Sequence, residues 1–225
     1  MTATKRPWSQ RTFAPHCTIA AAALVTLLFA RPAVAADPKV PPAPATSGKP
    51  IALLITGLDY TRPEISSRLA RDGEGELIGW DLVDNDRTPY AQDTPEDDGT
   101  ALAQALVAMP DTAAFTLLPV RINPADPLSL AKALAFVSRT PARTVLVPVW
   151  STKKDDWQPF SQAAGHFKDL AIVARACVER AAGEQDKIYP RDLGLPIVVA
   201  SPQAAAGQLN PWAGYIVRLP CRTTP

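Results

Sequence analysis

After residue 50 the sequence alternates between short apolar runs and amphipathic stretches, and this alternation restricts the fold more than any other feature. Apolar runs that read as strands lie at 51–56, 76–82, 114–120, 144–149, 172–176, 195–200 and 215–219. Helical spacing separates several of them, at 100–109, 128–137 and 160–170. Continuously apolar strands that alternate with helices are typical of a parallel sheet covered on both faces. We therefore predict an α/β domain with a parallel sheet of about seven strands.

The predicted helix at 128–137 illustrates how the helices should pack. Leu128, Leu130, Leu134 and Val137 are its large apolar residues, and we expect all four to face the sheet. Ligand sites of such folds form at the carboxyl ends of the strands. The turns after 56, 82, 150 and 176 are therefore the places to look for a site.

The first 35 residues have the pattern of a cleavable signal peptide. Lys5, Arg6 and Arg11 precede an apolar run at 18–30, and small residues at Ala33 and Ala35 match a cleavage site. A membrane span needs about twenty apolar residues, so we expect cleavage and no stable anchor. The sequence thus predicts a periplasmic or extracellular protein.

Removal of this leader changes both the charge and the cysteine content. Without its four basic residues, 19 Lys and Arg remain against 22 Asp and Glu, a net charge of −3. This balance argues against nucleic acid as a partner. Cys177 and Cys221 remain and are candidates for a disulfide in an oxidising compartment. Two separately buried thiols are the alternative, and the sequence does not distinguish them.

Residues 36–49 are rich in proline and alanine, and we interpret them as a linker that stays extended and buries little. The remaining residues, 50–225, form the predicted α/β domain.

Several segments of this domain resemble the subtilisin-like serine protease family, or subtilases. Residues 51–65, IALLITGLDYTRPEI, resemble the hydrophobic strand that leads into Asp-Thr-Gly and on to His-Pro-Asp-Leu. Residues 79–86, GWDLVDND, are similar to the family's Gly-x-Asp-Phe-Val-x-Asn-Asp. Residues 98–103, DGTALA, stand where the family has His-Gly-Thr-His-Val-Ala. The resemblance implies a subtilase-like fold.

The same resemblance implies that the catalytic triad is lost. The triad mechanism needs a histidine base and a carboxylate that orients it. Ile55 stands at the position of the carboxylate and Asp98 at that of the histidine. Cys177 or Val178 falls where the oxyanion asparagine should be, and the family's Gly-Thr-Ser-Met-Ala segment would lie beyond Pro225. The resemblance therefore predicts a pseudoprotease.

The resemblance also implies where a ligand would bind. Val149, Trp150 and Ser151 occupy the place of the substrate-binding strand, so a peptide or protein partner is expected there. A C-terminally truncated subtilase sheet would expose an apolar face, which predicts an oligomer or a second protein on that side. Two alternatives stay open. The first alternative to a pseudoprotease is a serine endopeptidase component whose nucleophile comes from another chain, and the second is an unrelated periplasmic α/β binding domain.

Other candidate residues have a simpler interpretation. His166 is the sole histidine of the mature chain, and its helical position favours a solvent-exposed role. The acidic loop between residues 81 and 98 is a candidate Ca²⁺ site, although it lacks the ligand spacing of an EF-hand. Carboxylates in such loops are usually only solvated, so no cofactor is expected.

Overall fold

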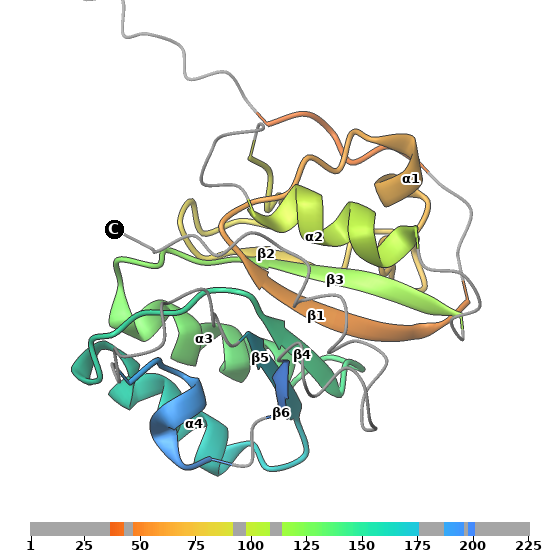
Figure 1. Ribbon diagram of the computed structural model, residues 1–225. Helices are drawn as coiled ribbons and strands as arrows, with labels where there is room; N and C mark the ends of the chain where they lie inside the picture. The colour runs from red at the N-terminus through yellow and green to blue at the C-terminus, as the bar shows by residue number, and fades with distance from the viewer. Residues whose placement is uncertain are drawn as a thin grey trace, which may run out of the picture. The chain divides into compact units, whose positions relative to one another are not determined.

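The computed structural model describes residues 37–42, 47–91, 98–108, 114–175, 187–195 and 198–200. Its described strands form one parallel sheet in the order β2-β3-β1-β4-β5-β6 (Figure 1). The strands are β1 (Lys49–Ile55), β2 (Trp80–Asp81), β3 (Phe115–Arg121), β4 (Thr144–Val147), β5 (Ala171–Arg175) and β6 (Val198–Ala200). The predicted α/β class with a parallel sheet is therefore confirmed.

Four α-helices accompany the sheet in the described part of the chain. They are α1 (Pro63–Ser66), α2 (Asp98–Val107), α3 (Pro127–Val137) and α4 (Gln158–His166). Short 3₁₀ turns lie at Asp155–Trp157 and Arg191–Leu193. None of the helices in these described ranges combines the length and hydropathy that a membrane crossing requires.

Strand β1 is central and is buried on both of its faces. Ile51, Leu53 and Ile55 point to one face, where they pack with apolar residues of α1 and α2. Ala52 and Leu54 point to the other face, where they pack with α3 and α4. Figure 1 shows α2 on one side of the sheet and α3 and α4 on the other. Burial on both faces requires a continuously apolar sequence, which β1 has.

The crossover through α2 has the opposite hand to those through α3 and α4. All three connections advance in the same direction along the sheet, from β2 to β3, from β3 to β4 and from β4 to β5. Helix α2 nevertheless lies on the other face from α3 and α4. Crossovers between parallel strands are right-handed in about 98% of cases, so a sheet with both hands is rare.

Two features of the predicted sheet need correction. The described residues contain six strands instead of about seven, and the predicted strand at 215–219 lies outside them. Residues 76–82 were expected to form one strand, but β2 contains Trp80 and Asp81 alone. The preceding residues fold back instead, because Leu77 bridges to Arg71 and the Ile78 N–H donates to the Ala70 carbonyl at 2.8 Å.

The expected packing of the apolar residues of α3 needs one correction. Asp126 caps the helix by accepting a hydrogen bond from the Leu128 N–H at 2.9 Å. Leu130, Leu134 and Val137 are buried as predicted, but Leu128 is 53% exposed. With 3.6 residues per turn, Leu128 lies on the opposite side of the helix from the other three, so it points to solvent.

This difference within α3 gives a matched pair of variants. Leu134→Ala should lower the free energy of unfolding by about 2–5 kcal/mol, because it leaves a cavity in a fully buried site. Leu128→Ala should change it by less than about 0.5 kcal/mol. Urea denaturation of both variants measures the difference. Equal losses would contradict the packing of α3 described above.

Candidate functional site

The carboxyl ends of β2, β3 and β1 place three side chains in one row. Asp81 pairs in register with Arg121, and Arg121 pairs with Ile55. Residues in register on parallel strands point to the same face, so the three side chains lie side by side on the face of the sheet that carries α2. This row is the candidate site, since ligands of open α/β sheets bind at the carboxyl ends of strands.

Ile55 lies fully buried in contact with the first turn of α2. A Cβ added to Gly99 would lie 2.8 Å from the Ile55 Cδ1 atom and 2.0 Å from the Gly57 carbonyl oxygen. No side chain fits between these elements, so glycine is required at position 99. The structure thus brings Ile55 next to the helix that begins at Asp98, whose own side chain is outside the described set.

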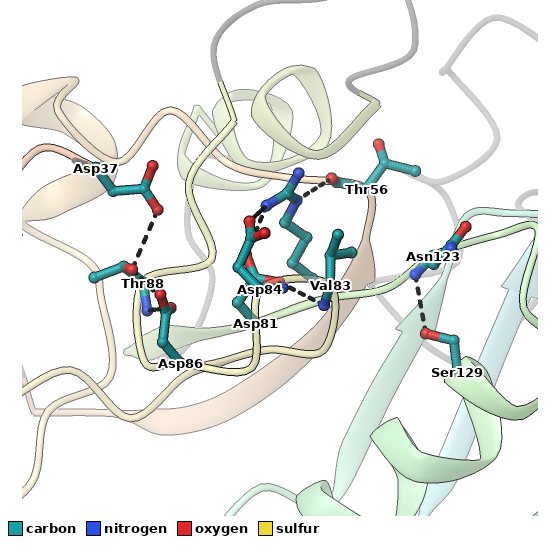
Figure 2. A network of polar contacts seen from close by, with 10 residues as sticks. Asp37, Thr56, Asp81, Val83, Asp84, Asp86, Thr88, Asn123 and Ser129 are labelled. Carbon is teal, nitrogen blue, oxygen red and sulfur yellow. Dashed lines mark hydrogen bonds and ion pairs between the residues drawn. The ribbon is translucent and has the colours of Figure 1, made fainter. Parts of the chain in front are cut away.

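Asp81 is fully buried, and both of its carboxylate oxygens are engaged (Figure 2). Oδ1 accepts hydrogen bonds from the backbone N–H groups of Val83 and Asp84, at 2.7 and 2.9 Å. Oδ2 accepts one from the Arg121 guanidinium, Nη1 to Oδ2 being 2.8 Å. Asp81 therefore serves as an anchor for loop 81–86 and is not placed to take a proton from a substrate.

Arg121 joins this loop to the end of β1. Its Nη1 also donates to Asp84 Oδ2 at 2.6 Å, and its Nε donates to the Thr56 carbonyl at 3.1 Å. Partial burial alone would lower the pKa of the guanidinium, but the hydrogen bonds and charges of Asp81 and Asp84 raise it above its ordinary value. The guanidinium is thus permanently charged, and it is held by acceptors at the ends of two strands, β2 and β1. Sequence reasoning missed it, although an arginine at the end of an apolar run was a visible signal.

Asp59 follows β1 and fastens the turn to α2. Its N–H donates to the Thr100 hydroxyl at 2.9 Å, and its carboxylate accepts hydrogen bonds from the Thr61 N–H and hydroxyl and from Arg62 Nε. Burial acts to raise the pKa of this carboxyl, but the hydrogen bonds from Thr61 and Arg62 outweigh it, so the pKa lies below its usual value. Asp59 is a charged turn residue with its partners in place.

The predicted binding strand follows β4 and is already in contact with other parts of the domain. Val149 and Trp150 are buried. The backbones of Ser151 and Tyr189 exchange two hydrogen bonds, of 3.1 and 2.9 Å. The Ser151 hydroxyl accepts a hydrogen bond from Trp157 Nε1 at 2.8 Å. The backbone and the hydroxyl of Ser151 therefore already have hydrogen-bond partners within the chain.

His166 lies far from the row in the fold. It is exposed at the end of α4, with its ring edge-on to Phe167 at a centroid distance of 4.8 Å. A crossover helix runs back from the carboxyl end of one strand to the amino end of the next. The end of α4 therefore lies at the edge opposite Ile55, and His166 is not a base for this site.

The remaining predicted residues divide into two groups. Cys177, Val178 and Cys221 lie outside the described residues, as do Asp93, Glu96 and Asp97 of the acidic loop. Within the described ranges, no three His, Cys, Asp or Glu side chains come together as a metal site. Of the acidic-loop residues that the structure describes, Asp81 and Asp84 bind Arg121, and Asp86 accepts hydrogen bonds from Thr88.

Comparisons with known proteins give likenesses to solved structures only. No protein-family model matches the sequence, and neither does any curated protein. Among solved structures, a lanthipeptide protease is similar with a TM-score of 0.43 and 19% sequence identity. The match covers 56% of this chain and 38% of the protease chain, which is less than half of that protein's length.

The buried ion pair predicts a large effect of removing one partner. Arg121→Met should lower the free energy of unfolding by about 3–5 kcal/mol, because it leaves the Asp81 charge buried without its cation. The double variant Asp81→Asn, Arg121→Met should recover part of this loss. Arg191→Met, which removes a more exposed pair with Asp192, is the control and should cost about 0–1 kcal/mol.

Urea denaturation of the three variants checks this expectation. If Arg121→Met were no more harmful than Arg191→Met, the pair would not be the anchor of the carboxyl edge.

Proposed function

We propose that the chain is an exported, subtilase-like protein that binds a peptide or protein partner without cleaving it. The observation that carries the proposal is the burial of Ile55 against Gly99. In the subtilase resemblance, this is where a carboxylate would orient the catalytic histidine. An isoleucine accepts no hydrogen bond, so the residue at this position cannot orient a histidine.

The neighbouring ionisable groups do not restore the missing chemistry. Acyl transfer needs a base within hydrogen-bond reach of a nucleophile. Asp81 is fully buried and its oxygens accept three hydrogen bonds, while Arg121 is a cation with no proton-accepting atom. The row is thus suited to hold the loops of the carboxyl edge rather than to transfer protons.

A binding role is supported by exposed apolar residues at the same edge. Val83 follows β2 and is 44% exposed, and Leu128 begins α3 after β3 and is 53% exposed. They are the exposed large hydrophobic residues within the described part of the chain. Both residues border carboxyl ends of strands, where ligands of open α/β sheets bind, so a partner bound there would contact them. Export is supported by the leader pattern of residues 1–35.

Selection from a displayed random peptide library tests this function. We expect the purified protein to enrich peptides, and Val83→Ala or Leu128→Ala to weaken their binding about tenfold, the effect of losing roughly 1.4 kcal/mol of contact. Lys168→Ala, at an exposed position near the opposite edge of the sheet, is the matched control and should not change it. Mass spectrometry of the recovered peptides should show them intact.

Two outcomes would count against the proposal. Cleavage of the bound peptides would make the chain a protease. Failure to enrich any peptide, or binding that is insensitive to both apolar variants, would remove the binding role at this edge.

A further inference from the structure

Residues 37–42, which we call the strap, lie against the domain through hydrogen bonds to three separate loops. The Pro38 carbonyl accepts from the Tyr60 hydroxyl at 2.6 Å. The Pro41 carbonyl accepts from Arg71 Nη2 at 2.7 Å. The Asp37 carboxylate accepts from the Thr88 hydroxyl at 3.2 Å, as Figure 2 shows. The first half of the segment predicted as a linker therefore makes defined contacts, and Val40 packs against the core cluster of α1 and α2.

Tyr60 is the most buried of the three residues that donate hydrogen bonds to the strap. Its side chain is fully buried, and its ring meets that of Tyr90 edge-on at a centroid distance of 5.1 Å. Burial, together with nearby Asp37, raises the pKa of the phenol, so it remains a protonated donor. A buried donor without an acceptor costs about 1–3 kcal/mol. The strap therefore supplies the acceptor for a phenol that is buried when the strap is docked.

Two of the three loops that the strap touches, at 57–60 and 86–91, also contact each other at the carboxyl edge. The Leu58 N–H donates to the Pro89 carbonyl at 3.1 Å, and the Ala91 N–H donates to the Leu58 carbonyl at 3.4 Å. A Cβ on Gly57 would meet the Ala91 Cβ at 2.0 Å, so the two segments are in close contact. Gly57 in turn touches Gly99 at the start of α2. The strap thus adjoins a continuous set of contacts that reaches the candidate site.

The chemistry of the strap suits an attachment that can be released. Three of its six residues are prolines (Pro38, Pro41 and Pro42), which have no N–H to donate to a strand. Its three hydrogen bonds to the loops all use strap acceptors, two carbonyls and one carboxylate. Proline also favours an extended backbone, which lowers the entropy lost on docking. Segments attached by few contacts belong to the least stable parts of a fold.

We propose that the strap is a latch for the carboxyl edge. When docked, it holds the turn at 57–60 and the loop at 86–91 together. When it leaves, the Tyr60 hydroxyl loses its acceptor and the Thr88 hydroxyl keeps only the Asp86 carboxylate. The two segments then separate while the sheet stays folded. This conformational role does not depend on the proposed binding function.

Hydrogen exchange of the full chain tests the latch. We compare the parent chain with an internal deletion of 37–42 and with Tyr60→Phe, which keeps the ring and removes the donor. The reporters are the Leu58 and Ala91 amides, and the Leu146 amide of β4 is the internal reference. The deletion should speed exchange at the reporters at least tenfold, and Tyr60→Phe about fivefold, with Leu146 unchanged. Lys39→Ala, at an exposed strap position, should change none of them.

Three results would overturn the latch. Unchanged exchange at Leu58 and Ala91 in both variants would show that the strap does not hold these segments. Equal acceleration at Leu146 would show that the strap only contributes to global stability. Unfolding of the deletion variant would show that it is an integral part of the domain.

Discussion

The burial of β1 on both faces is the constraint on which the rest of the structure depends. A central parallel strand has no face left for solvent, so every residue from Ala52 to Ile55 must be apolar, and helices must cover both sides. The helix pairs α1–α2 and α3–α4 supply that cover from opposite faces. Because the strand ends apolar at Ile55, the carboxyl edge beside it begins with a hydrocarbon side chain in place of a polar one.

The polar residues of this edge lie instead on the neighbouring strands β3 and β2. Arg121 lies one strand and Asp81 two strands away from Ile55, and they form a buried pair. The pair uses its remaining hydrogen bonds on Val83, Asp84 and Thr56. A buried pair of this kind depends on both partners, since either charge alone would be costly. Its consequence is a rigid scaffold for the loops, with exposed apolar residues, Val83 and Leu128, available at the rim.

Much of the fold follows from local patterns in the sequence, because they act over a few residues. The continuous apolar runs predicted β1, β3 and β4, and Asp126-Pro127 marks the start of α3. The prediction that Leu128 faces the sheet was wrong because it rested on the apolar character of the residue and not on its angular position around the helix. Strand β2 was predicted too long because Leu77 pairs with Arg71, an interaction that strand propensity does not encode.

The site was less predictable, because its contacts join distant residues. Asp81 and Arg121 are 40 positions apart, and no spacing rule relates them. Only the resemblance of residues 51–65 and 98–103 to two subtilase motifs indicated that Ile55 lies near the start of α2. The docking of the strap had no sequence signal at all, since its acceptors at Pro38 and Pro41 are backbone carbonyls that every residue possesses.

The central proposal is that the carboxyl edge around Ile55 performs no acyl transfer. Treatment of the purified protein with a fluorophosphonate probe, beside an active subtilase as the positive control and with casein as substrate, tests this most directly. The account predicts that no residue of this chain is labelled and that casein remains intact. Labelling of a serine in this chain, or casein cleavage that follows its concentration, would contradict it.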